Sequence, residues 1–272
     1  MDEPANRRVR VNGIELNVAV AGEGPPVLLV HGFPDDHDVW RKQIPALAAA
    51  GYRVIAPDTR GCGDSDAPLG VHRYKLDLLV SDLVALLDAL GIAKVRLVAH
   101  DWGAVIGWYF AVNHPERVDR YAALSVGHPT AYARGPLEQK LKGWYTVFFQ
   151  IRGFAEWLMR AGHWKLFRWF THFDEESPRW VSRLSRPGRL TAAINYYRAN
   201  LVTILFRKLP SARVPVLGIW SSGDRFLAEA QMVGSKQYVD APFRYERIEG
   251  AHHWVQLAAP DRVNALLLDY LR

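Results

Sequence analysis

The chain has 272 residues, of which 49% are hydrophobic, 12% aromatic and 23% charged. This composition is typical of a folded globular protein and excludes disordered, collagen-like and disulfide-rich classes. Lys and Arg total 34 and Asp and Glu total 28, which leaves a net charge of +6; so small an excess assigns no partner unless its position in the chain is known.

Cysteine content and hydrophobic patterning restrict the cellular compartment in which we expect the protein and its association with membranes. Cys62 is the only cysteine, so neither an intrachain disulfide nor a multi-cysteine metal site can form. The N-terminal residues lack the apolar core of a secretory signal, and no run of about 18 uncharged apolar residues occurs. We therefore expect a cytoplasmic protein with no membrane partner.

Short apolar runs alternate with longer amphipathic segments, a pattern typical of a mostly parallel sheet with crossover helices. The clearest helix runs from Leu76 to Leu90, where apolar residues recur every three or four positions until Gly91 ends the pattern. The predicted strands are, in chain order, Glu15 to Ala21, Pro26 to Val30, Arg53 to Pro57, Val95 to Ala99, Tyr121 to Val126, Val216 to Trp220 and Phe243 to Ile248.

The alternation stops between Thr130 and Leu209, where no strand-like run occurs. This segment holds five of the ten tryptophans, and its 14 Lys and Arg residues face only five Asp and Glu residues. Its net charge is therefore +9, and the rest of the chain carries −3. We predict an inserted helical cap at residues 130–209, with its arginines on solvated faces, and a core domain of residues 1–129 and 210–272.

A strand is predicted to turn directly into a helix at Ala99, His100, Asp101, Trp102 and Gly103. A central residue flanked by small residues two positions away is typical of the strained turn that lifts a nucleophile above a sheet. The start of the following helix favours the negative charge of a carboxylate at this position. We predict Asp101 as a nucleophile; the alternative is that its carboxylate only caps the helix.

Three further motifs end at the same predicted edge of the sheet. HGFP (31–34) follows an apolar strand, so the N–H groups of Phe33 and Trp102 are candidates for an oxyanion hole. Asp224 follows the strand VLGIW, and His252 and His253 follow the last strand. The chain order Asp101, Asp224, His253 is that of the α/β-hydrolase catalytic triad, and ligands gather at this edge in open α/β sheets.

The sequence resembles the α/β-hydrolase superfamily over essentially its full length. The motifs that carry the resemblance are HGFP (31–34), DTRGCGDSD (58–66), HDWGA (100–104), HPERV (114–118) and GAHHWVQLAAPDRVN (250–264). HDWG together with HGFP is similar to the epoxide hydrolase and haloalkane dehalogenase branch, in which aspartate replaces the serine of esterases. The resemblance implies an α/β fold with a mostly parallel eight-stranded sheet, flanking helices and an inserted helical cap.

The resemblance also implies an activity, the hydrolysis of an epoxide to a vicinal diol through an ester on Asp101. In this family His253, oriented by Asp224, would activate the water that hydrolyses the ester. His253 is preferred to His252 because the family's histidine directly precedes a tryptophan, here Trp254. No cofactor or metal is implied. The expected partners are a mainly apolar epoxide and water, without nucleic acid, for a monomer or homodimer.

Epoxide hydrolases donate protons to the epoxide oxygen from two cap tyrosines. Tyr197 in NYYRAN matches the second of them, whereas Phe148 stands where the motif places the first. Tyr145 lies three residues before Phe148, on the same face if the segment is helical. Tyr145 is therefore the candidate replacement, and the alternative is that Tyr197 acts alone. We expect the substrate pocket to include Phe33, Trp102, Phe148 and Trp254.

Two other functions remain open at this point. A haloalkane dehalogenase would use the same nucleophile and bind its halide with the indole N–H of Trp102 and a second indole from the cap. A catalytically weak ligand-binding member of the fold is the other alternative, although the complete set of Asp101, Asp224 and His253 disfavours it. The +9 cap is not accompanied by any nucleic-acid-binding motif.

Overall fold

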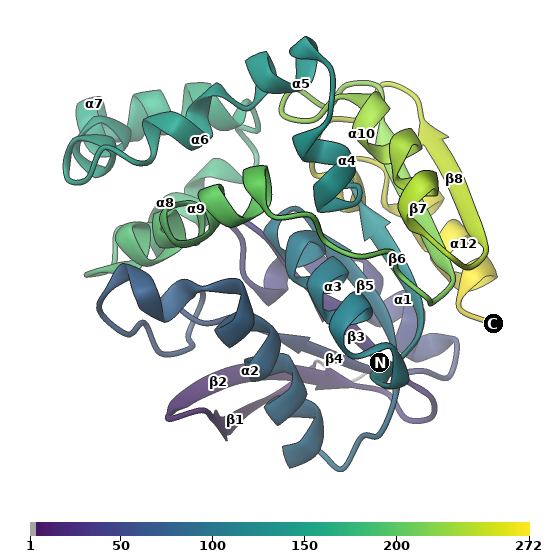
Figure 1. Ribbon diagram of the computed structural model, residues 1–272. Helices are drawn as coiled ribbons and strands as arrows, with labels where there is room; N and C mark the ends of the chain where they lie inside the picture. The colour runs from purple at the N-terminus through teal and green to yellow at the C-terminus, as the bar shows by residue number, and fades with distance from the viewer. Residues whose placement is uncertain (1–3) are drawn as a thin grey trace.

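The computed structural model describes residues 4–272. One eight-stranded sheet runs through the molecule in the order β1-β2-β4-β3-β5-β6-β7-β8 (Figure 1). Its second strand pairs antiparallel with β1 and β4, and all other pairs are parallel. The expected mostly parallel eight-stranded sheet is thereby confirmed. The strands are β1 (Ala5–Val11), β2 (Ile14–Ala21), β3 (Pro26–Val30), β4 (Arg53–Pro57), β5 (Val95–His100), β6 (Val118–Leu124), β7 (Val216–Ser221) and β8 (Phe243–Ile248).

Two strands differ from the prediction by more than one residue, for physical reasons. The first strand, β1, was not predicted because the first four residues of its sequence ANRRVRV are exposed and only Val9 and Val11 alternate with polar residues, as an edge strand allows. The strand predicted at 121–126 lies instead at Val118–Leu124, where its pairing with β5 begins at Val95 and ends at His100. It ends before Ser125 because this residue has a φ of +67°, outside the β region.

Helices cover both faces of the sheet, so the central strands are buried on both sides and have continuous apolar sequences. In Figure 1, α2, α3 and α10 lie in front of the sheet, and α1 and α12 lie behind it. The helix α3 follows β5 directly and is buried almost all round. The core helices are α1 (Gln43–Ala49), α2 (Leu76–Ala89), α3 (Trp102–Asn113), α10 (Glu229–Gly234), α11 (Val255–Ala258) and α12 (Pro260–Tyr270).

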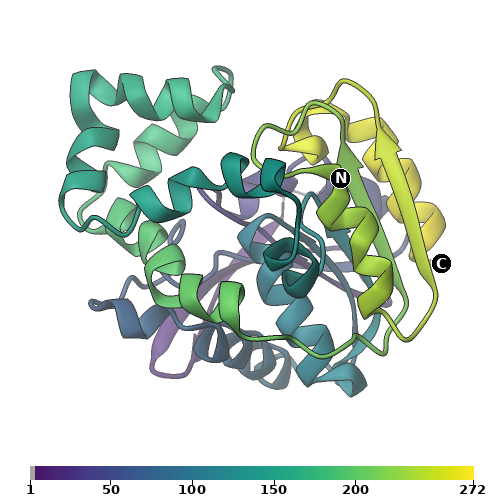
Figure 2. The same ribbon diagram turned by 45° about the horizontal axis from the view of Figure 1, so that its top comes forward.

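Helices inserted between β6 and β7 form the segment that we call the cap. It lies above the carboxyl ends of the parallel strands and extends to one side of the core (Figures 1 and 2). Within α7, residues 161–164 have non-helical backbone angles, so the helix is kinked there. The cap helices are α4 (Pro129–Ala133), α5 (Leu137–Lys142), α6 (Trp144–Phe148), α7 (Phe154–Thr171), α8 (Ser177–Leu184) and α9 (Arg189–Phe206).

Part of the positive charge of the cap is neutralised by the core. The guanidinium of Arg183 in α8 lies 3.0 Å from a carboxylate oxygen of Asp36 and 3.5 Å from one of Asp38. Arg186 pairs with Asp64 at 2.7 Å. The side chains of Arg183 and Arg186 are still 36% and 39% exposed, so this side of the cap is both solvated and paired with acidic residues of the core.

None of the helices among residues 4–272 combines the length and hydrophobicity of a membrane-spanning segment.

Candidate active site

Asp101 occupies a strained turn between β5 and α3. Its φ of 51° and ψ of −123° are unfavourable for a residue with a side chain, and the turn presents the carboxylate above the sheet edge. The close approach of strand and helix requires glycine at position 103, because a Cβ there would lie 2.1 Å from the carbonyl oxygen of Val30. Asp101 is 9% exposed, so its carboxylate is nearly shielded from bulk water.

The structure brings Asp101, Asp224 and His253 together from three separate loops. Nδ1 of His253 lies 2.8 Å from Oδ2 of Asp224, and Nε2 of His253 lies 3.4 Å from Oδ2 of Asp101. The other carboxylate oxygen of Asp224 accepts hydrogen bonds from the N–H groups of Phe226 and Leu227. Asp224 is thereby fixed, and it orients the imidazole so that Nε2 faces the carboxylate of Asp101.

A backbone donor holds the second oxygen of Asp101. The N–H of Phe33 donates to Oδ1 at 2.7 Å. A Cβ on Gly32 would lie 2.4 Å from this oxygen and 2.6 Å from the backbone nitrogen of Trp102, so Oδ1 and Trp102 N border the same small space. The backbone nitrogens of Phe33 and Trp102, the two candidates for an oxyanion hole, therefore lie beside one space, which Gly32 keeps open.

The charges of the triad stabilise one another. Burial disfavours the cationic form of His253, but Asp224 and Asp101 outweigh burial and raise its pKa to about 10. Burial also opposes ionisation of Asp101, but the hydrogen bond and charge of His253 hold the pKa of this carboxyl below its ordinary value of 3.8. In this site the imidazole of His253 is therefore cationic and the carboxyl group of Asp101 is ionised.

Sequence reasoning missed the residues that hold the loop of His253. The carbonyl oxygen of His253 accepts a hydrogen bond from Oγ of Ser125 at 2.8 Å, and Nε2 of His100 lies 3.0 Å from it. Burial lowers the pKa of His100 to about 3, so this ring is neutral and must carry its proton on Nε2 to donate. Ser221 bonds to the two preceding carbonyls, those of Ala251 and His252. Only the position of His100 beside Asp101 gave a signal in the sequence.

A cavity of about 550 Å³, including its open mouth, leads from the surface to Asp101. It lies between α4, α6 and α9, and its lining is almost entirely apolar or aromatic. A smaller cavity of about 240 Å³ lies on the other side of Asp101, next to Phe33, His253 and Trp254. Both volumes together suit a small apolar ligand of the size that such pockets commonly enclose.

The hydroxyl-bearing residues that line both cavities are Tyr145 and Tyr197. Their ring centroids are 5.8 Å apart, and the ring of Tyr197 also packs at 5.0 Å against Trp102. Burial, with a further contribution from the charge of Asp101, raises the pKa of each phenol well above 10. Both therefore stay protonated and can donate. Tyr132 in α4 also lines the larger cavity, a residue that sequence reasoning missed.

Phe148 is not a pocket residue, contrary to the prediction. Among residues 4–272, it is absent from the lining of both cavities at Asp101. Its ring packs against Trp144 and Phe154 on the outer side of the cap. Tyr145 and Phe149 lie on the buried side of α6, whereas Phe148 follows the exposed Trp144 by four positions and shares its outer side. Tyr145, one turn earlier, faces Asp101 instead.

Asp35 connects the cap to the loop of His253. One of its oxygens accepts the indole N–H of Trp180 in α8 at 2.8 Å, and the other accepts that of Trp254 at 3.0 Å. Burial raises the pKa of Asp35 well above its ordinary value of 3.8, although the hydrogen bonds from the two indoles act to lower it. Its Oδ2 lies 4.0 Å from Nδ1 of His100. Asp35 thus ties α8 to the residues on which the triad rests.

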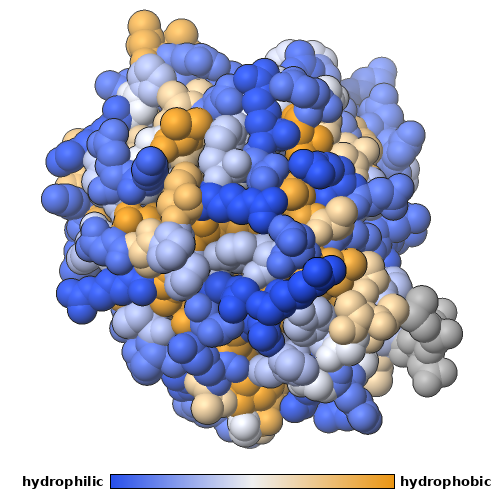
Figure 3. All heavy atoms as spheres, turned by 90° about the vertical axis from the view of Figure 1, so that its right-hand side faces the viewer, coloured by the Kyte–Doolittle hydropathy of each residue, from blue (hydrophilic) through white to orange (hydrophobic). Residues whose placement is uncertain are grey.

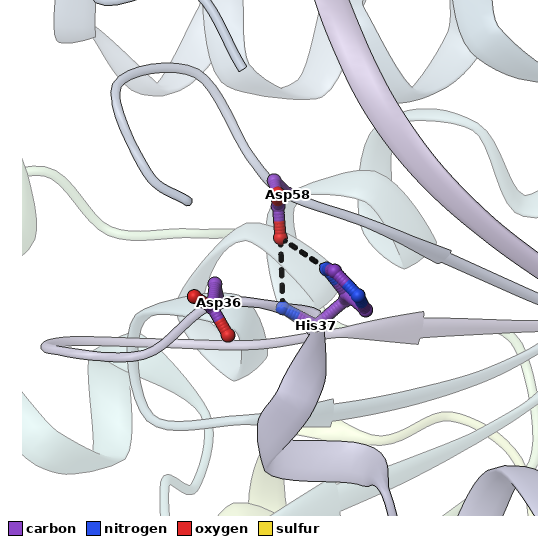
Figure 4. Close-up of side chains that lie close together, drawn as sticks. All are labelled: Asp36, His37 and Asp58. Carbon is purple, nitrogen blue, oxygen red and sulfur yellow. Dashed lines mark hydrogen bonds and ion pairs between the residues drawn. The ribbon is translucent and has the colours of Figure 1, made fainter. Parts of the chain in front are cut away.

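Asp36, His37 and Asp58 form a second buried cluster of ionisable groups (Figure 4). Oδ1 of Asp58 accepts the backbone N–H of His37 at 2.9 Å and contacts its Nδ1 at 2.7 Å. The oxygens of Asp36 are used by the N–H of Asp38 and by Arg183. Because a cation would have to displace these partners, the cluster is better explained as a support for the loop that carries Phe33.

The strand order, the strained turn and the triad at the carboxyl edge of the sheet define an α/β hydrolase. A model of the alpha/beta hydrolase fold family matches residues 25–260. Human epoxide hydrolase 4 is 34% identical over 97% of this chain and 78% of its own length. Epoxide hydrolase A of Mycobacterium tuberculosis is 32% identical over 100% of this chain and 98% of its own. The chain therefore belongs to the epoxide hydrolase family of the α/β-hydrolase fold.

Solved structures agree with this assignment over the whole chain. An epoxide hydrolase from Vigna radiata is 31% identical with a TM-score of 0.84, and the match covers 100% of this chain and 98% of that one. The epoxide hydrolase of Bacillus megaterium, solved in complex with an inhibitor, is 27% identical with a TM-score of 0.89, over 97% of this chain and 99% of that one.

Proposed function

We propose that this protein hydrolyses an epoxide to a vicinal diol through a covalent ester on Asp101. The observation that carries the proposal is the arrangement of Tyr145 and Tyr197 opposite Asp101 in one apolar cavity. A carboxylate nucleophile and two neutral phenols are what ring opening requires, since the carbon needs a nucleophile and the departing oxygen needs an acid.

In the first step, Oδ2 of Asp101 attacks an epoxide carbon. Oδ1 is held by the N–H of Phe33, which leaves Oδ2 as the attacking oxygen and makes Oδ1 the carbonyl oxygen of the ester. The C–O bond of the ring breaks as Tyr145 or Tyr197 gives a proton to the leaving oxygen. The phenols remain neutral until then because burial raises their pKa values.

In the second step, formation of the ester removes the charge of Asp101 and so one of the two carboxylates that keep His253 cationic. His253, still oriented by Asp224, then passes its proton through bound water to the phenolate that ring opening left on Tyr145 or Tyr197, and the neutral imidazole acts as a base toward water. The hydroxide attacks the ester carbon, and the oxyanion forms on Oδ1 beside the N–H groups of Phe33 and Trp102. Collapse breaks the bond between the ester carbon and Oδ2, and the departing alkoxide takes the proton of His253 and leaves as the diol. The new carboxyl group of Asp101 then reprotonates the imidazole, which restores the starting charges of the site.

A haloalkane dehalogenase is the alternative that shares this nucleophile. Halide binding would need a second indole N–H beside that of Trp102, but the indole N–H of Trp180 is bound to Asp35. Among residues 4–272, no cap tryptophan lines either cavity at Asp101. Trp144, Trp157 and Trp169 are more than half exposed instead. Phenols rather than indoles face the nucleophile, which favours an alkoxide over a halide.

Product analysis separates the two activities. The protein is incubated with an aryl epoxide and, separately, with a bromoalkane, and diol and bromide are measured. We expect diol from the first and no bromide from the second. Bromide release without diol would assign the protein to the dehalogenases. Neither product, from protein whose fold is intact by circular dichroism, would support a ligand-binding role.

The ring-opening step is expected to be independent of pH from about pH 5 to about pH 9. Asp101 is ionised throughout because its pKa lies below 3.8, and the two phenols stay protonated because their pKa values exceed 10. Ester hydrolysis needs neutral His253, so kcat should fall on the acid side as the ester form takes up a proton. Rapid-quench and steady-state rates test this; ring opening that slows steadily above neutral pH would contradict proton donation by these tyrosines.

Replacement of Gly32 by alanine is expected to lower kcat/KM by about a hundredfold or more. The added Cβ would come within 2.4 Å of Oδ1 of Asp101 and displace it from the oxyanion site. Gly234→Ala is the matched control, because its nearest neighbour would be the Cβ of Ala131 at 3.7 Å, an ordinary contact. Wild-type activity in Gly32→Ala would show that the space beside Phe33 and Trp102 has no catalytic role.

A further inference from the structure

The outer side of the cap carries a continuous line of exposed apolar side chains. They recur at every third or fourth position through α5, α6 and the beginning of α7, so they share one side of these helices. Each of them is at least 47% exposed. We call these residues the outer stripe: Leu137, Leu141, Trp144, Val147, Ile151, Phe154 and Trp157.

Ring contacts join the aromatic members of the outer stripe. The half-buried ring of Phe148 connects Trp144 and Phe154 at centroid distances of 6.1 and 6.4 Å, and Phe154 stacks on Trp157 at 5.6 Å. The opposite side of the same helices is buried and already forms the core of the cap. The outer stripe is therefore additional to that core, and contiguous exposed apolar surface of this kind marks an interaction site.

Positive charge surrounds the outer stripe. Within residues 137–168, Glu138 is the only exposed acidic residue. A second copy of the chain, docked by this face about a twofold axis, would bring like charges together. An anionic surface would complement them. The exposed basic residues of this range are Lys140, Arg152, Arg160, Lys165 and Arg168.

The large cavity has α6 on one side and α9 on another, and the end of α9 also exposes apolar residues next to basic ones. Tyr145 and Thr146, on the inner side of α6, line the cavity, and Leu201 lines it from α9. The end of α9 then exposes Val202 and Phe206, 72% and 82% respectively, before the exposed basic pair at 207–208. By contrast, the face shown in Figure 3, over α10, α12 and the C-terminus, is mainly hydrophilic, with apolar residues in small separate groups.

We propose that the outer stripe binds the surface of an anionic lipid bilayer. Tryptophan, leucine and phenylalanine beside lysine and arginine are the combination that inserts shallowly among headgroups while the cations contact acidic lipids. The protein binds the surface without spanning it, a mode that the expectation of no membrane partner did not consider. This benefit rests on the proposed function: the docked cap brings the cavity mouth close to the phase in which apolar epoxides dissolve.

Vesicle flotation tests the docking without any turnover. The full chain is mixed with vesicles of phosphatidylcholine alone, or of phosphatidylcholine and phosphatidylglycerol in equal parts. We expect binding to the anionic vesicles, weakened by added salt. The double variant Arg152→Glu, Trp157→Ser should bind at least about tenfold more weakly. The control variant Lys94→Glu, Leu69→Ser, which alters an exposed cation and an 89% exposed leucine of the core, should bind like the wild type.

Absence of binding to anionic vesicles would overturn the proposal, as would equal binding by the stripe variant. The protein could instead show no vesicle binding and sediment as a dimer that the double variant disrupts. That result would assign the outer stripe to an interface with a second copy of the chain. Melting temperature and turnover in vesicle-free buffer should match the wild type, because neither residue lines the cavities. If the first variant misfolds, Ile151→Asp tests the same face. If the protein does not hydrolyse epoxides, the vesicle-binding result still stands, because the flotation test involves no turnover.

Discussion

Replacement of Asp101 by asparagine is expected to lower kcat/KM by about 10⁴-fold or more. Asparagine is isosteric and its oxygen can still accept the N–H of Phe33, so the turn and the melting temperature should change little. The neutral amide cannot attack an epoxide carbon, and no ester can form. Diol formation measured by chromatography, with melting followed by circular dichroism, tests the expectation.

His253→Gln is the matched control for this variant. It keeps the carboxylate of Asp101 and both phenols, so the ring should still open once and leave one adduct per chain, visible by mass spectrometry of the peptide that contains Asp101. Wild-type protein after a single turnover in heavy-oxygen water should carry the label in the same peptide, because water attacks the ester carbon. An unlabelled Asp101, or an Asp101→Asn variant that turns over normally, would rule out the covalent route.

The fold could be predicted because its signals are local. Parallel strands buried on both faces have continuous apolar sequences, and Pro26–Val30 and Arg53–Pro57 were found at their observed bounds. The strained turn at Asp101 needs small residues at fixed positions, and these positions can be identified in the sequence. The edge strand β1 gave a weaker signal, because strand β2 holds it through backbone bonds while the side chains of its first four residues are exposed.

The site was less predictable where a side chain's direction depends on packing between helices. The motif placed Phe148 in the pocket, but the short helix α6 turns Tyr145 and Phe149 inward and Phe148 outward. The partners of Asp35 could not be found either, because Trp180 and Trp254 approach it from distant parts of the chain. The net charge of the cap did not reveal its ion pairs either, since Arg183 pairs with acidic residues of the core although its side chain is 36% exposed.

Removal of both cavity phenols is expected to slow ring opening by at least about 10⁴-fold, and removal of either one by about 10²-fold. The rings of Tyr145 and Tyr197 lie 5.8 Å apart, so one epoxide oxygen can accept from both hydroxyls. With one phenol left, the alkoxide still has a donor; with none, it must leave without an acid. Ester hydrolysis should change little, because His253 and Asp224 serve that step. Rapid-quench measurement of the ester and of the diol separates the two rates.

Two controls distinguish proton donation from packing. Tyr196→Phe removes a neighbouring buried hydroxyl that donates to the carbonyl oxygen of Arg60 at 2.6 Å, so it should affect stability and leave the rate of ring opening unchanged. Adding Phe148→Tyr to Tyr145→Phe should not restore the rate, because position 148 faces away from Asp101. Recovery in that double variant would show that the cap rearranges to bring position 148 into the cavity, and that the donor follows the family motif rather than the observed packing of α6.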